Sequence, residues 1–167
     1  LISAYANDSG GSNAGRTYAI MGISVPAEGG SMTMSMADYS FTGESLADAS
    51  GYSIAGDGDW DGDGLSDVVI GARENDDNGI DSGKVYLFFG STLAGMSGDI
   101  ALSDADMVIF GAQAGDMFGI RIKTIGDING DGNYDLIFGN NGPNEVYFGT
   151  GSTPYSQQHL VGHPPTL

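Results

Sequence analysis

The 167-residue chain has no cysteine, two histidines and only 5 Lys+Arg against 22 Asp+Glu, which gives a formal net charge of −17. The lack of cysteine excludes disulfides and thiol chemistry. Binding to nucleic acid or to an anionic membrane surface needs clustered Lys and Arg, so we expect neither partner. The longest apolar run, Val85–Phe89, has the length of a strand and is too short to insert into a membrane.

Residues suited to catalysis are also scarce. Both histidines, His159 and His163, lie near the C-terminal end, and no serine occupies a G-x-S-x-G turn. A nucleophile and base pair therefore has no obvious members, and we do not predict an enzyme.

What the chain does contain is a nine-residue acidic stretch that occurs twice, beginning at Asp59 and at Asp127. Oxygen-bearing side chains occupy positions 1, 3, 5 and 9, and glycine occupies position 6. With a backbone carbonyl at position 7, such a loop can surround Ca²⁺ with about six oxygens. No histidine or cysteine lies nearby, so zinc and copper are not predicted. The predicted ligands are Asp59, Asp61, Asp63, Leu65 and Asp67 in the first loop, and Asp127, Asn129, Asp131, Asn133 and Asp135 in the second.

An EF-hand begins in the same way but needs a glutamate at position 12 and a helix on each side. Position 12 is Ile70 in the first loop and Phe138 in the second. The flanking sequences are short apolar runs bounded by glycine, which indicate strands. A solvated Asp/Gly-rich turn is the alternative, and the presence of two copies argues against it.

The two loops belong to a longer repeat with a period of 68 residues, in which Gly15–Gly22 aligns with Gly83–Gly90. Each period contains apolar runs that do not alternate with polar residues, and such runs indicate inner strands covered on both faces. Four strands per repeat in stacked sheets are typical of a β-propeller blade. The expected strands are 52–56, 67–72, 84–89 and 106–110, with equivalents at 119–125, 135–139, 145–148, 16–21 and 38–41.

This repeat resembles FG-GAP, the repeat of the β-propeller in integrin α-subunits and in many secreted bacterial proteins. Its "FG" is Phe118-Gly119, weakened to Ser50-Gly51, and its "GA" is Gly71-Ala72 without the proline. The calcium loop matches the family at every liganding position over a resemblance that covers about residues 1–150. The resemblance implies an all-β fold of antiparallel four-stranded blades, with the ten residues named above binding two Ca²⁺ ions.

The chain holds about two and a half repeats, whereas closed propellers need at least about four blades, so we expect an incomplete ring. We expect a partial blade at 1–50, a complete blade with the first calcium loop at 51–117, a partial blade with the second loop at 118–150, and an extended tail or linker at 151–167. Because the chain does not begin with Met, we interpret it as a processed or excised piece of a longer protein.

Three other features have more than one interpretation. The acidic loop 73–83 is a solvated loop or a further cation site. Residues 31–36 alternate Ser/Thr with Met, which favours a strand or connector packing its methionines on the propeller edge; a contact with a neighbouring molecule is the alternative. Trp60 packs over its hairpin or offers a platform for a sugar.

The sequence therefore predicts a calcium-binding, extracellular or cell-surface, structural or adhesive module that takes part in a surface assembly or filament. Its partners would be further repeats of the same polypeptide or identical subunits. One alternative is a ligand-binding propeller segment that recognises a protein or glycan. Another is a segment of a larger secreted hydrolase.

Overall fold

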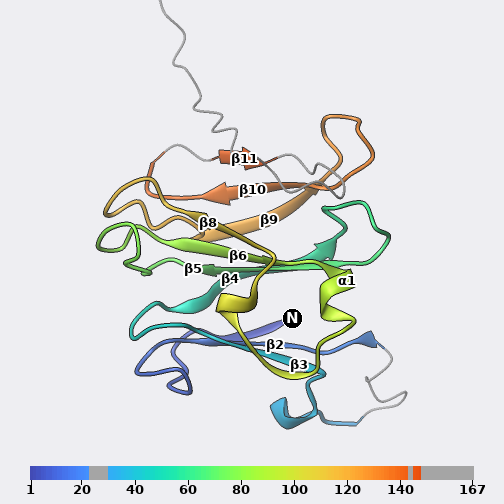
Figure 1. Cartoon of the computed structure of the whole chain (residues 1–167), viewed down its shortest axis with the longest axis horizontal. Coiled ribbons are helices and arrows are strands. Elements are labelled where there is room, and N and C mark those ends of the chain that lie inside the picture. Colours follow the sequence, from blue (N-terminus) through green and yellow to red (C-terminus); the bar gives the residue numbers. More distant parts are fainter. Residues whose placement is uncertain (23–29, 143–144, 148–167) are drawn as a thin grey trace, which may run out of the picture.

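A computed structural model describes residues 1–22, 30–142 and 145–147 (Figure 1). Its strands form three sheets. The first sheet contains, in spatial order, β1 (Ile2–Ala4), β2 (Arg16–Ala19), β3 (Tyr39–Thr42) and β7 (Gly98–Ala101). The second contains β4 (Ser50–Gly58), β5 (Asp67–Ala72), β6 (Lys84–Phe88) and β8 (Met107–Phe110), and the third contains β9 (Arg121–Gly126), β10 (Asp135–Gly139) and β11 (Glu145–Tyr147). Three short helical turns complete the described elements: η2 (Met34–Met36), α1 (Gly90–Leu93) and η3 (Leu102–Asp104).

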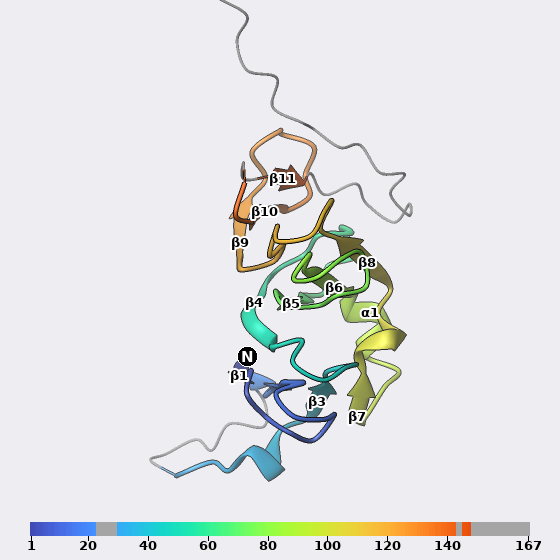
Figure 2. The same ribbon diagram turned by 90° about the vertical axis from the view of Figure 1, so that its left-hand side faces the viewer.

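The three sheets stack face to face in chain order, as Figures 1 and 2 show from two directions. All strand pairs except β3–β7 are antiparallel. The described strands do not close into a ring. The predicted all-β fold, an incomplete propeller of antiparallel blades, is confirmed.

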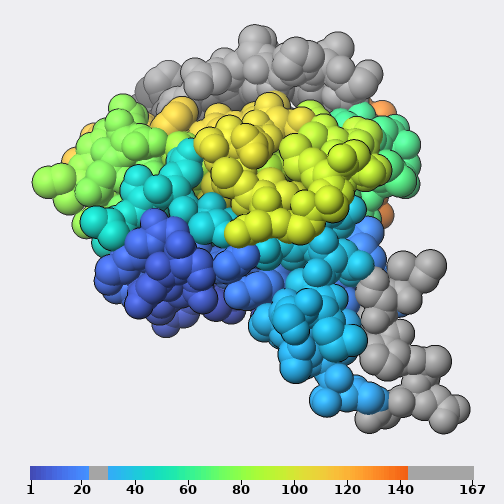
Figure 3. Space-filling view, turned by 60° about the horizontal axis from the view of Figure 1, so that its bottom comes forward, coloured from blue at the N-terminus to red at the C-terminus, as the bar shows by residue number. Residues whose placement is uncertain are grey.

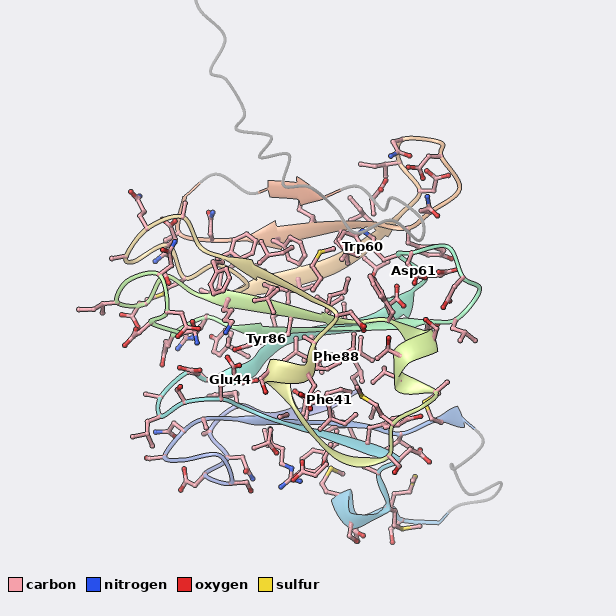
Figure 4. The ribbon with its side chains drawn as sticks, viewed as in Figure 1. Phe41, Glu44, Trp60, Asp61, Tyr86 and Phe88 are labelled. Atoms are coloured by element: carbon pink, nitrogen blue, oxygen red, sulfur yellow. The ribbon has the colours of Figure 1, made fainter. Side chains whose placement is uncertain are left out.

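The second sheet is buried on both faces, as its unalternating apolar strands predict. Every residue of β5 and β6 is buried. Toward the first sheet, Phe88 packs on Phe41 with ring centroids 4.9 Å apart. Toward the third sheet, Val69 and Leu87 join a cluster that includes Phe138. Two apolar layers therefore hold the three sheets together (Figure 4).

The glycines of the "FG" and "GA" motifs allow neighbouring sheets to approach closely. A Cβ atom added to Gly71 would lie 2.3 Å from the carbonyl oxygen of Gly119, which no side chain tolerates. Gly119 also has a φ of +81°, in the left-handed region that favours glycine. The motif thus marks the point where two blades touch through their backbones.

The sequence did not predict β7 or α1, both of which lie between β6 and β8. β7 does not join the second sheet, to which the strands before and after it belong. It pairs in parallel with β3 of the first sheet, with Tyr39 opposite Gly98 and Thr42 opposite Ala101. One strand of the expected 51–117 unit therefore completes the sheet of the preceding unit. The division of the chain at residues 50 and 117 stays a prediction.

The methionine-rich segment differs from its expected form. Residues 34–36 form the 3₁₀ turn η2, and residues 31–33, of which Thr33 is extended, belong to no sheet. Met34 and Met36 are 37% and 49% exposed, so they do not pack on the edge of the described sheets. The prediction of a strand or connector that packs its methionines on the propeller edge was therefore wrong for Met34 and Met36. The expected tail 151–167 lies outside the described residues.

A partly buried ionic cluster, with Lys84 and Tyr86 buried and both carboxylates exposed, also connects the first two sheets. The Lys84 ammonium lies 2.6 Å from a carboxylate oxygen of Glu44 and 2.8 Å from one of Asp77. The Tyr86 hydroxyl donates a 2.6 Å hydrogen bond to the same Glu44 oxygen (Figure 4). Burial raises the pKa of the Tyr86 phenol, and its hydrogen bond to Glu44 raises it further. Burial alone would lower the pKa of Lys84, but the hydrogen bonds and charges of Asp77 and Glu44 outweigh it and raise the pKa.

We expect this cluster to make the protein sensitive to alkali. Both shifts mean that the folded chain holds protons more tightly than the unfolded chain above pH 10, so the free energy of unfolding falls as the pH rises from there. A fully shifted group loses about 1.4 kcal/mol per pH unit. The Tyr86→Phe variant should lose about 1 kcal/mol less than the parent between pH 10 and 11 in urea unfolding. Tyr134→Phe, which alters an exposed tyrosine, is the matched control. Equal losses in the parent and Tyr86→Phe would contradict this account.

Candidate metal centre

The two acidic loops occupy equivalent places in neighbouring sheets. The first joins β4 to β5 and the second joins β9 to β10, and both lie at the same end of the stack (Figure 1). The backbone N–H of Tyr134 donates a 3.0 Å hydrogen bond to the carbonyl of Asp59, so the loops touch directly. Both hairpins thus place their oxygen side chains on one edge of the molecule.

Each loop is folded around the carboxylate at its first position. Asp59 accepts hydrogen bonds from the backbone N–H groups of Gly62, Asp63 and Gly64 at 2.8, 3.1 and 2.8 Å. Asp127 accepts the equivalent three bonds, at 2.6, 3.1 and 2.8 Å. In both loops the glycines at positions 4 and 6 have positive φ values, which turn these N–H groups inward.

The remaining side-chain bonds of the loops also correspond. The oxygen at position 3 accepts the N–H of position 5 at 3.1 Å from Asp61 and at 2.9 Å from Asn129. The carboxylate at position 9 accepts the N–H of position 2, at 2.6 Å for Asp67 and 2.8 Å for Asp135. The shared pattern shows that the nine-residue sequence encodes one loop conformation.

In the first loop, three carboxylates converge. Oxygens of Asp59, Asp61 and Asp67 lie within 4.8 Å of one another, and this is the one such group of acidic or histidine side chains among the described residues. Ligands about 2.3–2.6 Å from a common ion are at most about 5 Å apart, so the spacing fits a single Ca²⁺. Asp61 and Asp67 are buried (Figure 4 labels Asp61), and none of the salt bridges among the described residues involves the three acids.

Burial and neighbouring negative charges disfavour the ionised forms of Asp67 and Asp61. Burial raises the pKa of Asp67 to about 6, and the nearby charges of Asp61 and Asp59 add to the effect, against backbone hydrogen bonds from Gly90 and Trp60. Burial likewise raises the pKa of Asp61. A divalent cation would supply the positive charge that these groups lack, and the all-oxygen donor set suits a hard cation.

The second loop has the same pattern of backbone hydrogen bonds as the first loop but one fewer carboxylate. Asn129 replaces the carboxylate of Asp61, and its amide nitrogen lies 2.9 Å from a carboxylate oxygen of Asp131. Asp127 and Asp131 are exposed, whereas Asp135 is fully buried. A hydrogen bond from the backbone of Asn133 lowers the pKa of Asp131. No trio of close acids forms in this loop.

The structure adds one residue, Gly90, that the sequence analysis did not connect with the site, and it decides between the two interpretations of Trp60. The backbone N–H of Gly90, in α1, donates a 2.9 Å hydrogen bond to the second oxygen of Asp67. Trp60 is 5% exposed and packs with Val69 and Leu136, so it is no platform for a sugar. The Gly90 contact has no sequence signal, because it depends on how the connector after β6 returns to the loop.

The acidic loop 73–83 behaves as a turn whose acids are already engaged. The backbone N–H of Asp81 donates to the Asp76 carboxylate at 2.8 Å, and Asp77 pairs with Lys84. Among the described residues this loop contains no cluster of acids that could hold a metal. Of the two interpretations, the solvated loop agrees with these contacts.

Comparison with known proteins adds to this geometry. Integrin alpha-5 of Xenopus laevis is 32% identical over 106 residues, integrin alpha-PS2 of Drosophila melanogaster 33% over 106 residues, and integrin alpha-6 of Homo sapiens 35% over 103 residues. The chain carries an integrin-α-like FG-GAP repeat region. These matches cover 60–61% of the chain but only 7–9% of the relatives, so the repeat region corresponds to a small part of each. No family model matches the chain.

The repeat region has no membrane-spanning helix in the part that the structure describes, because its helices are too short.

Proposed function

We propose that this repeat region is a calcium-stabilised structural and adhesive module of an extracellular or cell-surface protein, with one Ca²⁺ in each acidic loop. The observation that carries the proposal is the convergence of Asp59, Asp61 and Asp67 within 4.8 Å, on a loop framework that the second loop repeats. Calcium would act as a clip that fixes each inner hairpin. It would take no part in catalysis.

The donor sets leave room for the ion. An ionised carboxylate has about four acceptor sites. Asp67 uses two of them for the backbone N–H groups of Trp60 and Gly90, so capacity for a cation remains. Asp63 and the carbonyl of Leu65 would complete the first shell from the exposed side of the loop. Asp127, Asn129, Asp131, Asn133 and Asp135 would hold the second ion in the same order.

An extracellular location is supported by the similarity to integrin α-subunits. Loops of this exposed kind also suit surroundings in which calcium is near millimolar. By the same similarity, we propose that the module associates with further repeats and presents a surface to a protein or glycan ligand.

Calorimetric titration of the metal-free chain with Ca²⁺ tests this proposal. We expect two binding events, the first loop binding several-fold more tightly because it offers four carboxylates against three. Asp63→Ala should abolish the tighter event and Asp131→Ala the weaker one. Asp104→Asn removes an exposed acid outside the loops and should leave both events intact.

Binding of one ion by the parent, or an unchanged stoichiometry in either alanine variant, would contradict the two-site assignment. Loss of the weaker event in Asp63→Ala would reverse the ranking of the loops.

A further inference from the structure

The connector between β6 and β8 links two neighbouring repeats by pairing with a strand of the preceding sheet. We call residues 98–105 the second-repeat strap: it consists of β7, η3 and Ala105. β7 pairs in parallel with β3 of the first sheet, while Ile100 and Leu102 are buried between the two sheets, at 4% and 0% exposure. The second repeat thereby supplies the outermost strand of the sheet that precedes it.

The first repeat contains the same segment 68 residues earlier. In this first-repeat strap, residues 30–37, Met32 replaces Ile100 and Met34 replaces Leu102. The 3₁₀ turn is also present, closed by a 3.2 Å hydrogen bond from Ala37 N–H to the Met34 carbonyl, as Ala105 N–H bonds Leu102 at 3.2 Å.

The backbone angles agree as well. Thr33 has φ −107° and ψ 157°, and Ala101 has φ −77° and ψ 140°; both are extended. The C-terminal residues of the two turns match more closely, with φ −64° and ψ 139° for Ala37 against φ −60° and ψ 140° for Ala105. At these two positions the backbone of the first-repeat strap resembles that of the paired strap, although residues 30–33 pair with no described strand.

The side chains of the first-repeat strap are less covered by the described residues than those of the second-repeat strap. Met34 is 37% exposed, whereas Leu102 is fully buried. The segment around η2, in light blue, projects from one end of the molecule in Figures 1 and 3. The sheet face beside it is open too: Ile2 is 44% exposed, although its equivalent Ile70 is fully buried against the first sheet.

The same open face carries a basic group that matches the partly buried ionic cluster around Lys84. Arg16 and Tyr18 are the equivalents of Lys84 and Tyr86, which share the carboxylate of Glu44 from the preceding sheet. The Nη2 atom of Arg16 already pairs with the Asp99 carboxylate at 2.8 Å and donates to the Ser40 hydroxyl at 2.8 Å, whereas its Nε atom is buried and has no hydrogen-bond partner. A cavity of about 370 Å³ lies beside it, lined also by Tyr18 and Met34.

We propose that the first-repeat strap adds as a parallel strand to the outer strand of a further repeat that lies N-terminal to residue 1 in the same polypeptide. Met32 and Met34 would fill the apolar layer between the two sheets, and Arg16 would receive a carboxylate placed as Glu44 is. The strap of a repeat reaches the repeat before it in the sequence, which assigns the partner to the N-terminal side. The integrin relatives, of which the chain spans less than a tenth, contain ample further sequence.

This inference deepens the proposed association with further repeats but does not depend on calcium. Its test is to fuse a second copy of residues 1–68 directly before Leu1, which keeps the 68-residue register and supplies an outer strand followed by Glu44. The added copy carries Met32→Leu and Met34→Leu, so that its peptides differ in mass. Oxidation by hydrogen peroxide, followed by mass spectrometry, then reports each methionine of the original strap.

We expect Met32 and Met34 to be oxidised at least about tenfold more slowly in the extended chain than in the parent, because pairing buries them. Met36 is the internal control, since its equivalent Asp104 stays exposed in the paired strap. Equal oxidation of all three methionines in a folded extended chain would overturn the proposal. So would concentration-dependent protection with a doubled mass in the parent, because a second copy would then be the occupant.

A variant of the parent chain decides the matter if the extended chain does not fold. This variant gives the second-repeat strap, which pairs with β3, the side chains of the first-repeat strap, and it keeps the contacts of Asp99. Its substitutions are Ile100→Met, Ala101→Thr, Leu102→Met and Asp104→Met. We expect the amides of β7 to remain protected from hydrogen exchange. The control, Ile100→Asp with Leu102→Asp, should lose that protection. Loss of protection in the methionine variant as well would show that the first-repeat strap cannot pair as β7 does, and would refute the inference.

Discussion

Saturating calcium is expected to raise the midpoint of thermal unfolding by about 10 °C or more relative to EDTA. Two sites filled at one hundred times their dissociation constants would each add about 2.7 kcal/mol to the free energy of unfolding. For a chain of this size each kcal/mol corresponds to about 2–4 °C. The effect should be large because calcium also relieves the repulsion among the clustered acids Asp59, Asp61 and Asp67. Scanning calorimetry in EDTA and in millimolar calcium measures it.

Magnesium should raise the midpoint far less, since it demands a small octahedral shell and sheds its water reluctantly. The doubly substituted Asp63→Ala, Asp131→Ala chain is the matched control and should respond to neither ion. Midpoints that coincide in EDTA and calcium would rule out a stabilising role for the ion. Equal shifts with both metals would indicate general charge screening.

Phe41→Ala is expected to lower the free energy of unfolding by about 3–5 kcal/mol. Phe41 is fully buried and its ring lies 4.9 Å from that of Phe88, across the layer that joins the first sheet to the second. Removing it leaves a cavity between two sheets and deletes an aromatic contact. Urea unfolding followed by circular dichroism, in saturating calcium, gives the change.

Phe110→Ala offers a comparison in the outermost strand of the second sheet, where the side chain is 44% exposed, and it should cost much less. If both substitutions lowered the free energy of unfolding by the same amount, the apolar layer around Phe41 would not be the main interaction between the first and second sheets. Phe41→Leu should recover most of the loss, because it refills much of the volume.

The sequence predicts those parts of the fold that depend on local pattern. The apolar run around Val69 and the glycine-bounded acidic loops are enough to place β5, β10 and both hairpins, because burial on two faces and tight turns each have a sequence signature. The ligand order also follows from the sequence. Which ligands are buried does not: Asp61 and Asp67 are covered and Asp63 is exposed, and this depends on packing beneath the loop.

The sequence does not predict the pairing of a segment whose partner is distant in the chain. The strand β7 is four residues long and pairs with a strand in another sheet, so no local period distinguishes it from a connector. The same holds for Gly90, whose N–H group reaches Asp67. The alternating methionines of residues 31–36 do have the period of a strand, but residues 34–36 form a 3₁₀ turn and the segment pairs with no described strand.

The second-repeat strap also sets the order in which the protein can be completed during synthesis. Ser40 in β3 and Asp99 in β7 are 59 residues apart in the chain and joined by a 3.0 Å hydrogen bond. The ribosome makes the chain from its N-terminus, so the first sheet lacks its outermost strand until most of the second repeat has been synthesised. During synthesis the first sheet therefore keeps an unpaired edge at β3 until the second repeat supplies β7.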